Sequence, residues 1–217
     1  MRETFHEQLE SLTDDLVEMT RLVESAMARA ATALLDADLA LAETVISADE
    51  AVDLLRESLD QRAFDLMARQ QPVATDLRAL IAALRMSADL ERMGDLARHV
   101  AKVARRRHPE SAIPAQLRAI VLEMSHTAAR VVTKTGSVIA SRNVEAAREL
   151  ERDDDEMDQL HRQLLTSLLD ERNNFGVETA VDVALVGRYY ERFADHAVSV
   201  ARRVIYLVTG VYPVTEG

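Results

Sequence analysis

The chain of 217 residues contains no cysteine and no tryptophan. Without cysteine it can form neither a disulfide nor a thiolate metal site, and it lacks a thiol nucleophile. Glycine occurs six times, proline four times, and aromatic residues make up 4% of the chain. A chain poor in turn residues and aromatics is unlike a β-sheet protein and is typical of long helices joined by short loops. The composition therefore predicts an all-α fold.

Long apolar runs and an excess of positive charge are also missing. No stretch reaches the roughly 18 uninterrupted apolar residues of a membrane span, and no secretory signal pattern opens the chain, so we expect a cytoplasmic protein. Lysine and arginine total 26 against 37 aspartate and glutamate residues, which gives a net charge of -11. This balance argues against nucleic-acid binding and is compatible with binding a cation or a basic partner surface.

Apolar residues recur every three to four positions over six stretches, as expected of long amphipathic helices. Asp38 is a suitable N-cap and Gly210 a suitable C-cap. Proline-containing or Asn-rich segments separate the stretches. A linker around 105–114, with two prolines and a basic cluster, divides the chain into two predicted domains, 1–108 and 112–217. The predicted helices cover about 3–36, 38–69, 75–107 and 117–138, then a stretch containing Met157 and Leu168, and finally about 177–209.

One helical stretch occurs twice, 100 residues apart. Residues 90–97 read Leu-Glu-Arg-Met-Gly-Asp-Leu-Ala, and residues 190–197 read Tyr-Glu-Arg-Phe-Ala-Asp-His-Ala. Since both copies lie in the last helix of their half, the repeat indicates a duplicated unit. The predicted architecture is two tandem three-helix bundles, related by internal duplication and built from long, spectrin-like helices.

Each copy of the repeat places a glutamate and an aspartate four residues apart, on one face of the helix. The middle helix of each half carries two aspartates at the same spacing. If these helices pack antiparallel, the two pairs of one half meet, because they lie at similar distances from the connecting turn. The candidate residues are Asp49, Asp53, Glu91 and Asp95 in the first half and Asp154, Asp158, Glu191 and Asp195 in the second.

Four converging carboxylates repel one another unless a cation neutralises them. Oxygen ligands suit Mg, Mn, Ca or iron better than a closed structural zinc site, and His99 and His161 lie near the same faces. The alternative is a solvated acidic face, on which Glu91→Gln is expected to cost little stability. Its neutralising partners would be Arg92, Arg98, Arg192 and Arg202.

Enzyme motifs are scarce. A ferritin-like di-iron site needs Glu-x-x-His on two helices of a four-helix bundle. Glu123 with His126 has this form, Asp158 with His161 approximates it, and both lie in a half with three predicted helices. We find no Gly-rich phosphate loop, nucleophile elbow or zinc-protease motif. A non-enzymatic binding or regulatory role is therefore expected; the alternative is a metal-dependent enzyme or metal-storage protein that uses the same carboxylates.

Four segments together carry a resemblance to a known family. Residues 70–78 read Gln-Gln-Pro-Val-Ala-Thr-Asp-Leu-Arg, and 89–95 read Asp-Leu-Glu-Arg-Met-Gly-Asp; residues 191–197 and 204–210 contribute the matching parts of the second half. Over almost its whole length the chain resembles the PhoU family of phosphate-transport regulators. In the second half the loop 173–176 replaces the Gln-Gln-Pro turn, which leaves open whether the two acidic sites are equivalent.

The resemblance implies two tandem three-helix bundles and a cytoplasmic negative regulator of the phosphate regulon. Such a protein would act as an adaptor between the ATPase subunit of the phosphate-specific ABC transporter and a phosphate-responsive sensor histidine kinase. It would reach the membrane only peripherally, through its partners, and a homodimer is expected. Because some family members carry metal on these acidic motifs, the resemblance assigns all eight carboxylates as ligands of Mg, Mn, Zn or Fe.

Overall fold

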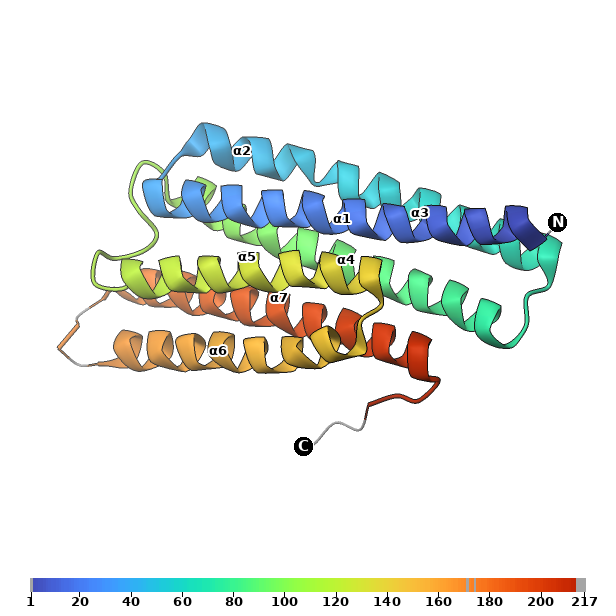
Figure 1. Ribbon diagram of the computed structural model, residues 1–217. Helices are drawn as coiled ribbons and strands as arrows, with labels where there is room; N and C mark the ends of the chain where they lie inside the picture. The colour runs from blue at the N-terminus through green and yellow to red at the C-terminus, as the bar shows by residue number, and fades with distance from the viewer. Residues whose placement is uncertain (1, 171, 174, 214–217) are drawn as a thin grey trace.

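The computed structural model describes residues 2–170, 172–173 and 175–213 (Figure 1). The regular secondary structure of these residues is entirely α-helical, which confirms the predicted fold class. Helices α1 to α4 form one half and α5 to α7 form the other, side by side along the length of the molecule. No helix among the described residues is long and apolar enough to cross a membrane. The helices are α1 (Arg2–Asp36), α2 (Leu39–Ala48), α3 (Glu50–Gln70), α4 (Ala74–Arg107), α5 (Arg118–Ser141), α6 (Val144–Leu169) and α7 (Val177–Thr209).

The caps foreseen from the sequence are present. The Asp38 carboxylate accepts a hydrogen bond from the Leu41 backbone N–H at 2.9 Å and so begins α2. Asn143 begins α6 in the same way. Gly210 ends α7 with a φ of 77°, a left-handed conformation that suits glycine.

The helix predicted over 38–69 is interrupted at Asp49, so that it forms two helices, α2 and α3. Just before the break, the Ser47 hydroxyl lies within hydrogen-bond distance of the carbonyl oxygens of Glu43 (3.0 Å) and Thr44 (3.1 Å). Hydroxyl bonds to the preceding turn compete with the helical ladder and bend helices. The break leaves Asp49 between two helix ends, with its carboxylate facing α4.

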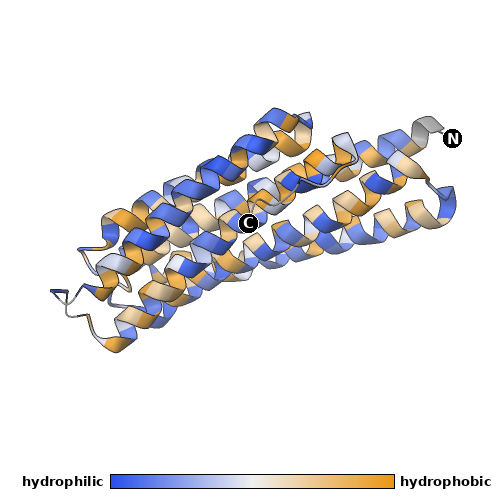
Figure 2. Ribbon diagram, turned by 90° about the horizontal axis from the view of Figure 1, so that it is seen from below, coloured by the Kyte–Doolittle hydropathy of each residue, from blue (hydrophilic) through white to orange (hydrophobic). Residues whose placement is uncertain are grey.

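Hydrophobic and hydrophilic residues alternate along the helices (Figure 2), and the buried ones are mostly apolar. One apolar core runs through both halves. It includes the repeated positions Leu90 and Met93 with their counterparts Tyr190 and Phe193, all fully buried. The core extends across the two halves through contacts of α1 with α5 and of α4 with α7. The division into domains 1–108 and 112–217 stays a prediction.

Helices α4 and α7 run antiparallel and are joined by ion pairs at separate levels. Near the middle of α4, Asp89 accepts a hydrogen bond from Arg203 Nε at 2.7 Å. At the end of α4, Arg106 and Arg107 pair with Asp182, whose side chain is 3% exposed. The basic cluster at the end of α4 therefore holds the two halves together, because a buried carboxylate needs a charged partner.

Candidate functional site

The predicted antiparallel packing within each half is confirmed, and it brings the candidate carboxylates together in two groups. The α4 motif faces the α2–α3 break, and the α7 motif faces α6, so the groups lie on opposite edges of the molecule (Figure 1). We call Asp49, Asp53, Glu91 and Asp95 the first set, and Asp154, Asp158, Glu191 and Asp195 the second set.

An arginine bridges the two helices of the first set. Arg98 on α4 places Nη1 2.8 Å from Oδ2 of Asp49, and its Nη2 contacts Oδ1 of Asp95. Arg92 adds a contact of 2.9 Å to the other oxygen of Asp95. The Asp49 side chain is only 8% exposed. Burial raises the pKa of its carboxyl, and the positive charge of Arg98 opposes that rise.

Glu91 also belongs to the paired, mostly buried part of the first set. Its side chain is 13% exposed, and its Oε2 lies 3.0 Å from Nη1 of Arg56 on α3. Burial raises the pKa of Glu91, while Arg92 and Arg56 oppose the rise. The expectation that Glu91 is solvated is therefore wrong, whereas the small cost expected of Glu91→Gln stays a prediction.

The second set lacks the bridging arginine. The residue 100 positions after Arg98 is Val198, which is 5% exposed. Among the described residues, neither Asp154 nor Asp195 makes a side-chain ion pair, and Oδ1 of Asp154 is buried without a hydrogen-bond partner. A buried carboxylate oxygen without a donor or cation is costly.

The other two carboxylates of the second set have partners that do not bridge to Asp154 or Asp195. Arg188, on the same helix as Glu191, contacts its Oε2. Nδ1 of His161 on α6 lies 3.4 Å from that oxygen. Asp158 is 4.0 Å from Arg162, one turn later on α6.

Burial and unbalanced negative charge raise the pKa values of two aspartates of the second set. Burial raises the pKa of Asp154 to about 7, and the negative charges of Asp195 and Asp158 add to the effect. Burial and the charge of Glu191 also raise the pKa of Asp195, although its side chain keeps contact with solvent. Near neutral pH this set holds a proton that a metal cation could replace.

The two sets differ in their fit to a metal ion. The second set offers carboxylate oxygens, the ligand type that hard cations prefer, and one of them, Oδ1 of Asp154, is buried and unpartnered. In the first set the Arg98 guanidinium already lies between Asp49 and Asp95. In the part of the chain that the structure describes, no three Asp, Glu or His side chains are close enough to hold a metal ion as they stand. The assignment of eight metal ligands stays a prediction.

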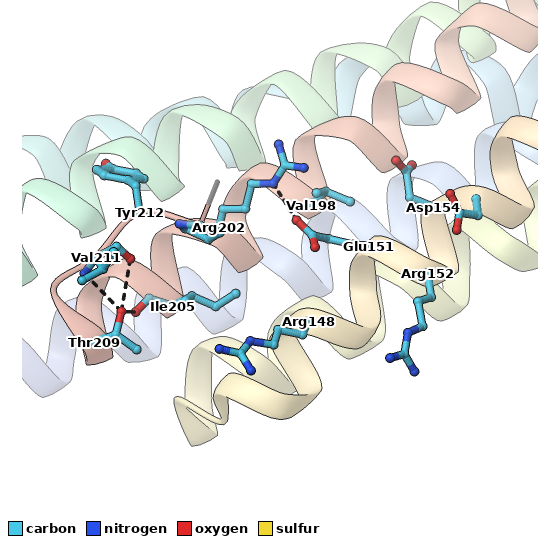
Figure 3. Close-up of a pocket in the computed structure, with 12 residues that line it drawn as sticks. Arg148, Glu151, Arg152, Asp154, Val198, Arg202, Ile205, Thr209, Val211 and Tyr212 are labelled. Atoms are coloured by element: carbon cyan, nitrogen blue, oxygen red, sulfur yellow. Dashed lines mark hydrogen bonds and ion pairs between the residues drawn. The ribbon is translucent and has the colours of Figure 1, made fainter. Parts of the chain in front are cut away.

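A groove beside the second set was not predicted from the sequence. It has a volume of about 870 Å³ and lies between α6 and the end of α7, with Asp154 and Val198 in its lining (Figure 3). Arg202 also lines it but pairs with Glu151 at 2.8 Å, so the prediction that Arg202 neutralises the repeated acidic motif is wrong. The last turns of α7 extend beyond the turn that joins α5 and α6, which leaves this side open (Figure 1).

The histidines considered from the sequence have other surroundings. His99 stacks on Tyr189 of α7 with ring centroids 5.3 Å apart. Burial lowers the pKa of His99, and the positive charge of Lys102 lowers it further. His126 is exposed on α5 beside Glu123. Its place on the outer surface is that of an ordinary helix residue.

Several known proteins are similar to this chain in sequence and in structure. The PhoU domain model matches residues 16–104 and 121–204, once in each half. The phosphate-specific transport system accessory protein PhoU homolog 2 of Mycobacterium tuberculosis is 50% identical over 213 residues, covering 98% of this chain and 100% of that protein. The crystal structure of PhoU from Pseudomonas aeruginosa has a TM-score of 0.86 at 29% identity, over 95% of this chain and 100% of that one. The phosphate transport system regulatory protein PhoU from Streptococcus pneumoniae shares the fold, with a TM-score of 0.88 at 22% identity over 97% and 99% of the two chains.

Proposed function

Because the chain belongs to the PhoU family, we propose that it is a regulatory accessory protein of phosphate-specific transport. The observation that carries this proposal is similarity over the full length: the M. tuberculosis relative aligns with 98% of this chain at 50% identity, and its name describes such an accessory protein. The duplicated helical fold agrees with that of the solved relatives.

The proposed role is that of an adaptor in the cytoplasm. One partner is the ATPase subunit of the phosphate ABC transporter, and the other is a phosphate-responsive sensor histidine kinase. When phosphate is plentiful, the adaptor keeps the kinase in its non-signalling state and so acts as a negative regulator. Support comes from the net charge of -11, which favours contact with basic partner surfaces. Contact with the membrane is through the transporter, and a homodimer remains our expectation.

A metal role is part of the same proposal. The second set would bind a divalent or ferric cation, with Mg, Mn, Zn and Fe as the metals to test. Its support is the buried, unpartnered Oδ1 of Asp154 among four carboxylates. A cation there would neutralise the repulsion between α6 and α7 and so stabilise their packing.

Two measurements test the regulatory role. Deleting the gene should induce phosphate-starvation genes in phosphate-rich medium, and re-expression should restore repression. The purified protein should bind the purified ATPase subunit and the cytoplasmic part of the kinase in calorimetry. Normal repression in the deletion strain, together with no binding to either partner, would refute the proposal.

The alternative of a metal-dependent enzyme is tested separately. The purified protein, loaded with Mn²⁺, is incubated with a chromogenic phosphate monoester. We expect no turnover above a chelated control. Phosphatase turnover that disappears in Asp195→Asn, while the fold is retained, would favour the enzyme over the adaptor.

A further inference from the structure

We infer that the outer face shared by α4 and α7 docks a homodimeric protein on that partner's twofold axis, so that one chain of this protein engages two partner subunits. The partner surface that fits is acidic at its centre and apolar on both sides of the centre. This inference rests on the proposed adaptor role and deepens it, because it assigns the docking face, the chemistry of its partner and the stoichiometry.

Helices α4 and α7 lie against each other and leave one common side exposed. Helix α1 packs on α4, α5 packs on α7, and α1 packs on α5, so α1 and α5 cover one side of the α4–α7 pair (Figure 1). Helices α3 and α6 flank the pair at its two edges. On the remaining side, each helix exposes a stripe of residues at helical spacing. We call the two stripes together the outer face, which contains Leu77, Ile81, Arg85 and Arg92 on α4 and Val177, Val181, Leu185, Arg188 and Arg192 on α7.

The internal repeat gives the outer face an approximate twofold axis, because α4 and α7 are antiparallel copies of one helix. His99 of α4 stacks on Tyr189 of α7, and Oδ1 of Asp89 on α4 lies 3.1 Å from Nδ1 of His196 on α7. Exchanging the two helices through the 100-residue repeat carries the first contact to positions 89 and 199, within one turn of the second contact. The axis therefore passes close to positions 94 and 194.

The centre of the outer face presents arginines, although the whole chain carries a net charge of -11. The Arg92 side chain is 59% exposed, whereas that of its partner Asp95 is 16% exposed. Arg188 is 54% exposed over Glu191, which is 19% exposed. Arg192 is exposed and makes no ion pair among the described residues. Guanidinium groups therefore form the outermost layer at the centre, and each keeps donors for carboxylates of a partner.

Exposed apolar residues lie on both sides of this basic centre. They are spaced four residues apart, Leu77 and Ile81 on α4 and Val177, Val181 and Leu185 on α7. Because the helices are antiparallel, the two groups lie at opposite ends of the outer face. Val177 is 82% exposed and Val181 is 51% exposed. Grouped exposed apolar residues beside arginines are typical of protein–protein interfaces.

The symmetry and the charge of the outer face define its occupant. Both stripes run from apolar residues at the helix start to arginine near the axis, so the face offers the same chemistry twice. A homodimer presents one patch twice about its own twofold axis, and its two subunits can therefore engage the two stripes alike. A second copy of this chain does not fit the face, because its arginines would oppose those of the first copy. The arginines instead complement an acidic centre on the partner.

The test is binding of the full chain to the purified ATPase subunit and to the dimeric cytoplasmic part of the kinase, measured by calorimetry and analytical ultracentrifugation. The complex should contain two partner subunits for each chain of this protein, and its affinity should fall with added salt. Arg92→Glu and Arg192→Glu should each weaken binding by at least about 10-fold, because the two positions are equivalent about the axis. Arg21→Glu is the matched control: it reverses an arginine that is 70% exposed on α1, on the opposite side of the molecule, and should bind like wild type.

The apolar ends of the outer face are tested in the same assay. Ile81→Ser and Val181→Ser should both weaken binding, since they occupy equivalent positions of the repeat. Leu122→Ser on α5 is the control, because Leu122 is 40% exposed and Ile81 is 38% exposed. This control should bind like wild type.

Three outcomes would overturn the inference: one partner subunit per chain, undiminished binding in Arg192→Glu, or a loss in only one of the two arginine variants. Circular dichroism checks that each variant is folded. If Arg92→Glu does not fold, Arg192→Glu and Val181→Ser decide the result, since neither breaks an ion pair of the described residues. Wild-type binding that survives every substitution on the outer face refutes the face and leaves the adaptor role standing.

No binding of the wild-type protein to either partner would instead refute the adaptor role. The face is then tested by a photo-cross-linking residue placed at position 81 or 181 in cells. The inference holds if both positions cross-link the same homodimeric protein, position 122 does not, and Arg192→Glu abolishes the cross-link. It is refuted if the two positions have no common cross-linked protein.

Discussion

Replacing Asp154 by Asn should stabilise the metal-free protein at alkaline pH and have little effect at acidic pH. In the folded protein the pKa of Asp154 is raised to about 7, from an ordinary value of 3.8. The folded state thus holds a proton that the unfolded chain releases. Stability linked to this group is present below the unfolded pKa and is lost as pH rises through about 4 to 7. An Asn side chain resembles the protonated carboxyl and cannot ionise, so it avoids that loss.

The size of the effect follows from the shift. A difference of about three pKa units corresponds to at most about 4 kcal/mol. Because Asp154 keeps some contact with solvent and shares protons with neighbouring carboxylates, we expect about 1–2 kcal/mol above pH 7. At about pH 3, below the unfolded pKa, Asp154 is protonated in both the folded and the unfolded protein, and the difference in unfolding free energy between wild type and variant should be near zero.

Urea unfolding with a chelator present, at about pH 3 and about pH 8, measures both values. Asp155→Asn, an exposed aspartate next along α6, is the control and should show a much smaller pH-dependent gain. Adding Mn²⁺ at the higher pH should stabilise the wild-type protein more than the Asn variant, because a ligand stabilises the state that binds it. An equal gain at both pH values, or none at the higher one, would refute the burial argument.

Three further substitutions test the packing. Leu90→Ala should lower the unfolding free energy by about 2–5 kcal/mol in denaturant titrations, because Leu90 is fully buried; a loss under about 1 kcal/mol would contradict this. Gly136→Ala would place a methyl group 2.6 Å from Oγ1 of Thr20, between α5 and α1. Gly136→Ala should therefore destabilise the wild-type protein. In a Thr20→Ala background, where the clash is removed, the same substitution should stabilise the protein by up to about 1 kcal/mol, because alanine has the higher helix propensity. Equal effects in both backgrounds would exclude the clash. Glu91→Gln should cost less than about 1 kcal/mol near neutral pH, because the burial that raises the pKa of Glu91 offsets what the pair with Arg56 contributes; a loss above about 2 kcal/mol in urea titrations would contradict this.

Much of the candidate site could be predicted because it depends on local regularities. Helical periodicity and the scarcity of breakers fixed six long stretches, and the i, i+4 spacing put Glu91 with Asp95 on one face. Similar distances from each connecting turn then predicted which carboxylates meet across α3 and α4, and across α6 and α7. These inferences need the helix repeat and an antiparallel connection, and both are properties of neighbouring residues.

The interruption at Asp49 and the groove beside the second set were harder to foresee. Helix propensity does not exclude a continuous helix through Ser47, and hydroxyl contacts like those of Ser47 with the preceding turn also occur inside unbroken helices, as at Thr133. The groove arises because α7 extends beyond α5 and α6, so its presence depends on how three helices align.

Helical periodicity and motif spacing depend on neighbouring residues, so an all-α, duplicated chain with eight carboxylates at repeated positions could be predicted without the structure. Which charged side chains pair with one another depends on how the helices pack. Arginine side chains are long enough to reach several carboxylates, so the choice of Asp49 and Asp95 by Arg98, and of Glu151 by Arg202, depends on helix separation and rotation. The same arrangement leaves Asp154 without a partner, since burial and missing donors are properties of packed neighbours and not of spacing along the chain.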